Sequence, residues 1–280
     1  MSRRLTSEQV ATYRDDGWLA PLDLLSPTEV AEARAALERY EATTGGPIGG
    51  AERTGGHMLF TWVDELMRND DLLDAVEDLI GPDILCWNSI FWVKEAQSPT
   101  YVSWHQDLNY WGLDNDELVN VWVALSPASL ESGCMQVLPG SHHEALDHDE
   151  TYAADNMLTR GQELQIDVGD REVATMALTP GQMSMHNVLL AHGSGPNTTN
   201  DRRIGLSLQY MPTHTKQRLV EWDSAALVRG TDRFGHFEHA PRPQHDFDPA
   251  AVAFHARAAE SLRELLYQGA TPPEERAPTL

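Results

Sequence analysis

The first third of the chain has hydrophobic and polar positions at the spacing of amphipathic helices. Thr6 and Ser26 are each followed three residues later by glutamine or glutamate, which is the capping-box pattern, and Pro27 lies where the first helical turn tolerates proline. Helices are therefore predicted over about residues 7–15 and 27–43. A third helix is predicted within DDLLDAVEDLIGP, because apolar residues recur at helical spacing and the segment ends in a Gly-Pro stop signal.

From residue 84 the pattern changes to short runs of β-branched and aromatic residues separated by turn residues, which is typical of strands. The predicted fold is mainly β with helical additions. It is one domain over 1–280, with an N-terminal helical part (1–83), a cupin-like jelly-roll or double-stranded β-helix core (84–212) and a C-terminal extension and helix (213–280). The six candidate strands are ILCWNSIFWVK, VNVWVALSPA, CMQVLPGS, REVATMAL, QMSMHNVLLAH and RRIGLSLQYMP.

Two internal segments lack periodicity. EATTGGPIGGAERTGG contains six glycines and is predicted to be a loop, of the kind that often covers an active site. The polar and acidic insert near 143–170 is predicted to be a surface excursion. Close to the C-terminus, DPAAVAFHARAAESLRELLYQ is predicted to be a helix and the final PPEERAPTL to be disordered.

Composition and charge exclude several classes of protein. No stretch approaches the roughly 18 apolar residues of a membrane span, and the start MSRRLTSEQV lacks the apolar region of a signal peptide. The formal net charge of -23 would repel nucleic acid and anionic lipid surfaces. Cys86 and Cys134 are too few for a disulfide framework. We therefore expect a cytoplasmic monomer or homodimer that acts on a small-molecule substrate, without nucleic-acid or membrane partners.

The segment YVSWHQDLNYWG contains candidate metal ligands. His105 and Asp107 are two residues apart, so on a strand both side chains point to the same face. A further histidine would complete a 2-His-1-carboxylate triad, which binds Fe(II) and leaves positions open for a bidentate oxoacid and O₂. The H-x-D pair alone is weak, because two residues at a fixed gap often occur by chance.

The run MHNVLLAHGSGPNTTNDRRIGLSLQYMP strengthens this interpretation. His192 ends an apolar segment, a turn follows, and Arg203 comes eleven positions later at the start of another apolar strand. An arginine beside the metal can bind the distal carboxylate of 2-oxoglutarate bidentately, which lysine does less well. His186 would share the strand face of His192, so spacing alone leaves it open as the third ligand. The turn and the gap to Arg203 favour His192.

These segments resemble the phytanoyl-CoA dioxygenase family of Fe(II)- and 2-oxoglutarate-dependent oxygenases. The resemblance covers about residues 84–212 and rests on WHQD, VWVALSPASLESGCMQVLPGSH and HGSGPN with its trailing arginine, in this order and spacing. It implies that His105, Asp107 and His192 are the iron ligands. It also implies that Fe(II), 2-oxoglutarate and O₂ are the cofactor and co-substrates.

The resemblance further implies residues that bind the co-substrate. Arg203 and Ser194 would contact the distal carboxylate of 2-oxoglutarate, while Gln106 and Trp122 would line its pocket. A strand-borne tryptophan also packs in a core regardless of function, and Ser194 could equally be a turn residue. Halogenating relatives lack the carboxylate at the position of Asp107, so hydroxylation is favoured here.

The expected function is therefore oxidation, most simply hydroxylation, of a C–H bond in a small polar metabolite or natural-product intermediate, with release of succinate and CO₂. The alternative is a non-redox β-helix protein, or a degenerate relative, that only binds a metal or ligand. The acidic chain has no basic cluster for a coenzyme A thioester. Specificity is expected to come from loops, and the candidate segments are 44–56, 60–68, 109–117 and 229–237, with Trp111 and Phe234 as possible pocket walls.

Overall fold

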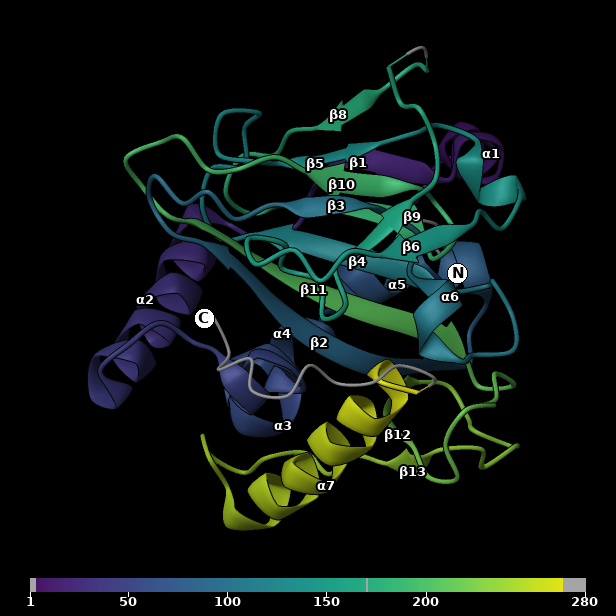
Figure 1. Cartoon of the computed structure of the whole chain (residues 1–280). Helices are drawn as coiled ribbons and strands as arrows, with labels where there is room; N and C mark the ends of the chain where they lie inside the picture. Colours follow the sequence, from purple (N-terminus) through teal and green to yellow (C-terminus); the bar gives the residue numbers. More distant parts are fainter. Residues whose placement is uncertain (1–3, 170, 269–280) are drawn as a thin grey trace.

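The structure is a computed structural model that describes residues 4–169 and 171–268. Two β-sheets face each other, and helices cover the outer face of the larger one (Figure 1). The larger sheet has seven strands in the order β1-β9-β4-β11-β2-β12-β13, and the smaller has four in the order β3-β10-β5-β8. A two-stranded hairpin, β6-β7, lies in the insert. The predicted jelly-roll core with helical additions is confirmed.

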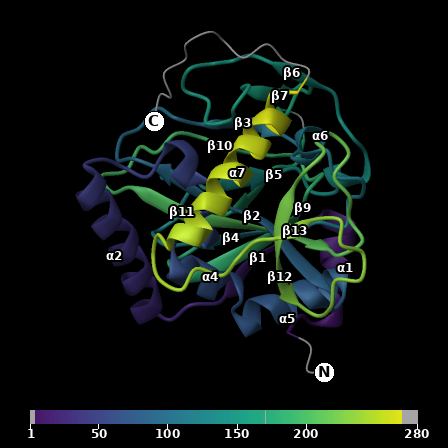
Figure 2. The same ribbon diagram turned by 90° about the horizontal axis from the view of Figure 1, so that it is seen from below.

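The helical elements include the three helices predicted before residue 84 and the predicted C-terminal helix. Both predicted capping boxes form; for example, Thr6 Oγ1 accepts a hydrogen bond from the backbone N–H of Gln9 at 3.1 Å. Helix α7 crosses in front of the sheets in Figure 2, which is seen from below. The helices are α1 (Ser7–Asp16), α2 (Pro27–Thr44), η1 (Gly50–Arg53, a 3-10 turn), α3 (Gly56–Leu59), α4 (Thr61–Met67), α5 (Asp70–Ile80), α6 (Leu108–Trp111), η2 (Ser141–His143, a 3-10 turn) and α7 (Pro249–Leu266).

The strands confirm the six candidate segments and correct their extent. The strands are β1 (Trp18–Asp23), β2 (Ile84–Lys94), β3 (Val102–His105), β4 (Val119–Ala124), β5 (Met135–Val137), β6 (His148–Glu150), β7 (Gln162–Leu164), β8 (Ala174–Met176), β9 (Gln182–Asn187), β10 (His192–Ser194), β11 (Arg203–Pro212), β12 (Ser224–Arg229) and β13 (Glu238–His239).

Three expectations about these segments need correction. The N-terminal part is not purely helical, because β1 pairs with β9 at the edge of the large sheet. The segment 182–192 is not one strand: β9 ends at Asn187, and His192 begins β10 in the other sheet. The insert is more than a surface excursion, because it forms a hairpin and contributes to the cavity described below. The tail PPEERAPTL lies outside the described residues.

Strands β4 and β11 run through the middle of the large sheet and divide their side chains between its two faces. On the outer face, Val121 and Leu206 pack into the main hydrophobic core with the helices. On the inner face, Asn120, Trp122 and Ser207 line a cavity between the sheets. This alternation of period two places polar groups inside the jelly roll, while the apolar residues anchor the sheet to the helices.

Candidate active site

Two neighbouring strands of the smaller sheet bring the three predicted metal ligands together. Strand β3 ends at His105 and strand β10 begins at His192, and these residues are direct partners in the antiparallel pairing of the two strands. Their ring centroids are 4.1 Å apart. Asp107 follows β3 at the start of α6, and one ligand atom from each of the three side chains lies within 4.8 Å of the others. All three could therefore contact one metal ion.

Backbone carbonyls orient both imidazole rings. His105 Nδ1 lies 2.9 Å from the carbonyl oxygen of Ser103, and His192 Nδ1 lies 2.9 Å from that of Leu190. Since a carbonyl only accepts hydrogen bonds, each Nδ1 carries the proton and each Nε2 presents a lone pair. Burial, together with the neighbouring His105, lowers the pKa of His192 well below its usual value, so that the ring is neutral as a metal ligand requires.

The carboxylate of Asp107 is held in one orientation. Its Oδ1 lies 3.2 Å from His105 Nε2, and its Oδ2 accepts a hydrogen bond from Asn120 Nδ2 at 3.1 Å. The hydroxyl of Ser207 in turn donates to Asn120 Oδ1. Burial raises the pKa of Asp107, but His192 and His105 together outweigh this effect and lower it to about 2. The group is thus an anion at neutral pH, with one oxygen directed toward the histidines.

His186, the alternative third ligand, lies beside this group but belongs to a different strand. Its ring centroid is 4.8 Å from that of His192, and it is fully buried on β9, opposite Asn120 in the pairing with β4. Neither ring nitrogen has a hydrogen-bond partner. The residues whose ligand atoms converge include His192 and not His186. The turn at 188–191, which moves the chain to the other sheet, separates the two histidines.

A cavity of about 250 Å³ opens from the three ligands. Both sheets contribute inner-face residues, while the Gly-rich segment, the insert, α6 and α7 close the remaining sides. The lining includes Arg53, Trp87, Asn88, Trp92, His105, Asp107, Tyr110, Trp111, Asn120, Trp122, Met157, His192, Ser194, Arg203, Ser207, Leu262 and Leu266.

Arg203 lies at one end of this cavity, at the start of β11. Its side chain is buried, and Nε and Nη2 have no hydrogen-bond partner among residues 4–169 and 171–268. The guanidinium lies over the indole of Trp122, with its carbon 5.3 Å from the ring centroid. Burial lowers the pKa of Arg203 to about 10, so the group remains charged at neutral pH. A buried cation with orphaned donors is expected to meet an anionic ligand.

Gly205 makes the position of Trp122 possible. A Cβ atom built at this glycine would lie 1.8 Å from Cζ2 of Trp122. The indole therefore crosses directly over the backbone of β11, between Arg203 and Ser207, where any larger residue would displace it. The absence of a side chain at 205 thus helps to shape the floor below Arg203.

Ser194 also lies at the Arg203 end, where a lysine that the sequence reasoning missed contacts it. Lys94, the strand partner of Arg203, donates from Nζ to Ser194 Oγ at 2.7 Å and is fully buried. Burial, together with the charge of Arg203, lowers the pKa of Lys94 to about 6. Lys94 lies two residues after Trp92 on the same strand, so the two side chains point to the same face. This spacing is the feature of the sequence that could have indicated Lys94.

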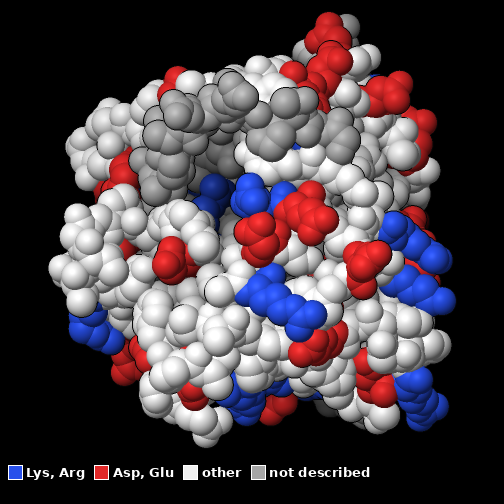
Figure 3. Space-filling model, turned by 60° about the horizontal axis from the view of Figure 1, so that its bottom comes forward, with Lys and Arg blue, Asp and Glu red and all other residues white. Residues whose placement is uncertain are grey.

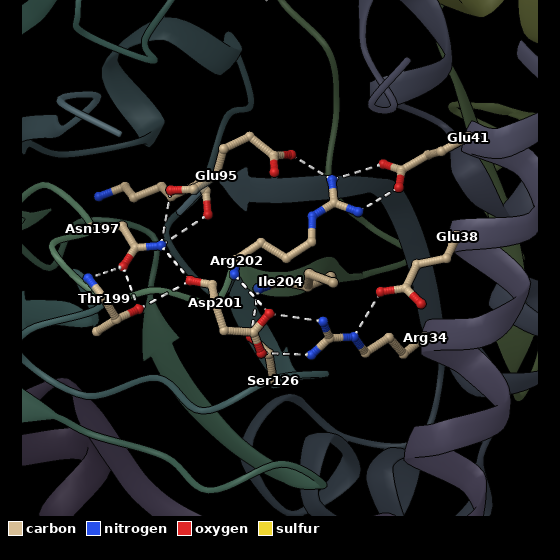
Figure 4. Close-up of polar contacts among 11 residues, drawn as sticks. Arg34, Glu38, Glu41, Glu95, Ser126, Asn197, Thr199, Asp201, Arg202 and Ile204 are labelled. Atoms are coloured by element: carbon tan, nitrogen blue, oxygen red, sulfur yellow. Dashed lines mark hydrogen bonds and ion pairs between the residues drawn. The ribbon is translucent and has the colours of Figure 1, made fainter. Parts of the chain in front are cut away.

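A network of ion pairs fixes the turn that leads into Arg203 (Figure 4). Arg202 bonds the carboxylate of Glu41 through both terminal nitrogens, and Arg34 bonds Asp201 bidentately at 2.9 and 3.0 Å. Arg34 and Glu41 belong to α2, so this helix holds the turn from outside while Arg203 points inward. Bidentate pairs of this kind add geometric specificity.

The same turn is tied to the end of β2 by one amide. Asn197 Nδ2 donates to the backbone carbonyls of Lys94, Glu95 and Asp201 at 3.1, 2.9 and 2.9 Å. It follows the Gly-Ser-Gly-Pro turn, and its side chain replaces strand pairing where β10 and β11 separate. The contacts connect the two segments that carry Ser194 and Arg203.

Gln106, expected in the co-substrate pocket, is not among the residues that line the cavity. Its side chain is fully buried; Nε2 donates to the carbonyls of Glu144 and Leu189 at 2.9 and 2.6 Å, and Oε1 accepts from Leu146 N–H at 2.8 Å. The chain leaves β3 at His105 and turns into α6, so that His105 and Asp107 face the metal position while the residue between them faces away. Gln106 instead holds the segment that follows η2.

The segments expected to control specificity are only partly placed at the cavity. The Gly-rich segment contributes Arg53, and the segment after β3 contributes Tyr110 and Trp111. Segments 60–68 and 229–237 contribute no lining residue, and Phe234 is 55% exposed at the surface.

The insert and α7, which were not expected at the site, close it from the substrate side. Arg160 in the insert pairs with Glu150 at 2.6 Å and donates to the carbonyl of Gln268, just beyond α7, at 2.8 Å. Its guanidinium lies 5.5 Å from the ring centroid of Tyr110. One buried arginine therefore joins the insert, α6 and the end of α7 over the cavity.

Comparison with known proteins identifies the family. The family model described as "Phytanoyl-CoA dioxygenase (PhyH)" matches residues 13–205. The chain belongs to the phytanoyl-CoA dioxygenase family. The predicted resemblance is therefore confirmed, and the match extends toward the N-terminus beyond the segment from which it was first recognised.

Proteins similar to this phytanoyl-CoA dioxygenase family member are named for several different substrates or activities. A probable alpha-ketoglutarate-dependent hypophosphite dioxygenase of Stutzerimonas stutzeri is 28% identical over 228 residues, or 73% of this chain and 78% of the relative. An ectoine dioxygenase of Nocardia farcinica is 25% identical over 252 residues, or 80% and 83% of the two chains. The apo structure of the non-heme monooxygenase ThoJ has a TM-score of 0.81 and 33% identity, covering 92% and 97%.

The family consists of non-haem iron dioxygenases that use Fe(II), 2-oxoglutarate and O₂, and the cavity fits these groups. Two imidazoles and a carboxylate suit Fe(II), and the orphaned donors of Arg203 suit a carboxylate. Within residues 4–169 and 171–268, no helix is both long and apolar enough to cross a membrane.

Proposed function

We propose that this chain hydroxylates a C–H bond of a small metabolite or natural-product intermediate, with Fe(II) held by His105, Asp107 and His192. The observation that carries the proposal is the convergence of these three ligand atoms within 4.8 Å, in a cavity that also contains a buried arginine with orphaned donors. The relatives named for hypophosphite and ectoine suggest a small substrate.

The co-substrate would lie between the metal and Arg203. Arg203 would bind the distal carboxylate of 2-oxoglutarate, with Ser194 and Lys94 beside it and Trp122 below. When bound, Fe(II) with 2-oxoglutarate and O₂ supplies the oxidising chemistry, and succinate and CO₂ are the co-products. The protein's own contribution is to orient these groups and to exclude water from the cavity.

Asp107 supports hydroxylation as the type of reaction. Its carboxylate occupies the position that halogenating relatives leave free, and Asn120 holds its second oxygen away from the histidines. Two oriented imidazoles and one carboxylate oxygen leave three metal positions for the co-substrate and O₂. The walls of Trp87 and Trp111, whose ring centroids are 5.1 Å apart, would hold the substrate next to these positions.

The substitution Asp107→Ala tests the proposal. It should reduce substrate-independent formation of succinate from 2-oxoglutarate at least 100-fold and weaken Fe(II) binding by a similar factor, because one of three protein ligands is lost. Asp155→Ala is the matched control, since Asp155 is an exposed carboxylate that is not among the residues lining the cavity. Succinate would be measured by mass spectrometry and metal affinity by anaerobic titration. Normal turnover in Asp107→Ala would refute the assignment of the metal ligands.

A further inference from the structure

A second arginine, Arg53, lines the same cavity, near enough to Arg203 for its charge to lower the pKa of that group. Arg53 ends η1, and its guanidinium stacks on Trp92, with its carbon 4.4 Å from the ring centroid. Its Nε donates to the carbonyl of Phe91 at 3.1 Å, and Nη1 lies 3.5 Å from that of Met157. These contacts hold the planar group against one wall, between the Gly-rich segment and the insert.

Within the part of the chain that the structure describes, the charge of Arg53 has no counter-ion. Among the described residues, no carboxylate forms an ion pair with Arg53, whereas Arg34, Arg160 and Arg202 all have acidic partners. This is unexpected in a chain with a net charge of -23. Burial lowers the pKa of Arg53 to about 10, so it remains a cation at neutral pH. Arg53 is half-buried, and a cation partly withdrawn from water without a partner is costly unless a ligand supplies the opposite charge.

The proposed cofactors do not supply that charge. The two positive charges of Fe(II) and the one of Arg203 are balanced by Asp107 and the two carboxylates of 2-oxoglutarate. Lys94, with a pKa of about 6, adds little charge at neutral pH. One positive charge, that of Arg53, is left over. A further anionic group in the cavity would restore the balance.

We propose that Arg53 binds an anionic group, a carboxylate, phosphonate or sulfonate, of the primary substrate. This inference rests on the proposed function and specifies its substrate class. The rest of that compound would be a ring system, because Trp87, Tyr110 and Trp111 wall the cavity on the substrate side and Leu262 of α7 adds apolar surface. Flat apolar walls with one fixed cation select a ring that carries a single acid group.

The outer surface supports a ligand with one or few charges. On the face turned forward in Figure 3, acidic and basic side chains are interspersed and form no broad field of one sign. A polyanion such as a nucleotide would need several basic groups. The cavity instead offers one unneutralised guanidinium.

Two matched probes test the proposal: indole-3-acetate and indole-3-acetamide, which have nearly the same shape and differ in charge. Each would be titrated calorimetrically, without O₂, into protein loaded with Fe(II) and 2-oxoglutarate. Wild type should bind the acetate about tenfold or more tightly than the amide, as expected for a charge-assisted hydrogen bond. In Arg53→Gln this preference should disappear, and Arg53→Lys should retain part of it. Arg233→Gln is the control for net charge, because Arg233 is exposed and does not line the cavity.

The second arm of the experiment measures the Kd of 2-oxoglutarate in the same proteins. Arg53→Gln should change it less than about threefold, whereas Arg203→Gln should raise it tenfold or more. An equal loss in both variants would assign Arg53 to the co-substrate and overturn the proposal. Equal affinity of wild type for the two probes, or no binding of either at about 5 mM, would also overturn it. Since binding requires no turnover, these outcomes are independent of the succinate assay that tests the proposed function.

Discussion

The substitution Gly205→Ala tests whether the floor of the co-substrate pocket is as tightly packed as the structure indicates. The added Cβ would lie 1.8 Å from Cζ2, 2.1 Å from Cε2 and 2.6 Å from Cη2 of Trp122. These distances are far below van der Waals contact, and the obstacle is a rigid ring. Trp122 is almost fully buried, so it must move as a unit or the strand must shift.

Overpacking of this kind costs about 1–3 kcal/mol of unfolding free energy. In a protein of this size each kcal/mol corresponds to roughly 2–4 °C, so the Tm should fall by about 2–12 °C. Because Arg203 lies over the same ring, its guanidinium should be displaced as well. The Kd of 2-oxoglutarate should therefore rise about tenfold or more, as expected when a charge-assisted hydrogen bond is lost.

Differential scanning calorimetry would measure the Tm, and isothermal titration calorimetry would measure the Kd of 2-oxoglutarate. Gly46→Ala is the matched control, because a Cβ at Gly46 would meet nothing within 4 Å. Adding Trp122→Leu to Gly205→Ala removes the clash and should recover part of the Tm, while 2-oxoglutarate binding stays weak for lack of the indole floor. An unchanged Tm and an unchanged Kd in Gly205→Ala would refute the packing argument.

Three further predictions concern groups around the ligands. Asn120→Leu should weaken Fe(II) binding about tenfold or more, because Asp107 loses the donor on its second oxygen; anaerobic titration with Asn120→Asp as a further variant would measure this. Unfolded Lys94 keeps its proton up to about pH 10.5, whereas the folded group loses it above about pH 6. The unfolded state therefore binds more protons between these pH values, so the contribution of Lys94 makes the free energy of unfolding rise with pH across that window. Chemical denaturation at several pH values should show a smaller slope of unfolding free energy against pH in Lys94→Met. Glu41→Gln loosens the bidentate pair with Arg202 and should raise the KM for 2-oxoglutarate several-fold with little change in kcat.

Much of the fold could be predicted because its signals are local. The capping boxes of α1 and α2 lie within four residues, and each forms as predicted. The pair His105 and Asp107 was predicted to share a face from strand periodicity alone, and their closest atoms are 3.2 Å apart. The break between β9 and β10 was missed, since the apolar run from Val188 to Ala191 looks like a continued strand and is in fact a buried turn between sheets.

Groups that depend on strand register could not be predicted in the same way. Asn120 reaches Asp107 and Ser207 only because β4 lies next to β11 in the large sheet, and β3 faces them from the other sheet. Lys94 meets Ser194 because β2 and β11 are paired with Lys94 opposite Arg203. A single sequence does not specify which strands are neighbours. Strand periodicity therefore predicts the face on which Asn120 and Lys94 lie, but not the residues that they contact.

The substrate side was the least predictable part, and the reason is structural. Its walls come from η1, α6, the insert and α7, which lie far apart in the sequence and meet only over the cavity. The polar and acidic composition of the insert predicts a surface excursion, yet one of its acids, Glu150, pairs with Arg160, which also donates to the carbonyl of Gln268 just beyond α7. Arg53 differs from Arg160 in having no acidic partner among the described residues. In the sequence it is one basic residue in a glycine-rich loop. Among residues 4–169 and 171–268 it has no acidic partner around its folded position, and this absence is what indicates a ligand-binding role. The same comparison separates it from Arg160. Arg160 contacts Tyr110, is neutralised by Glu150 and joins protein segments, whereas Arg53 lines the cavity and is left charged, available to a ligand.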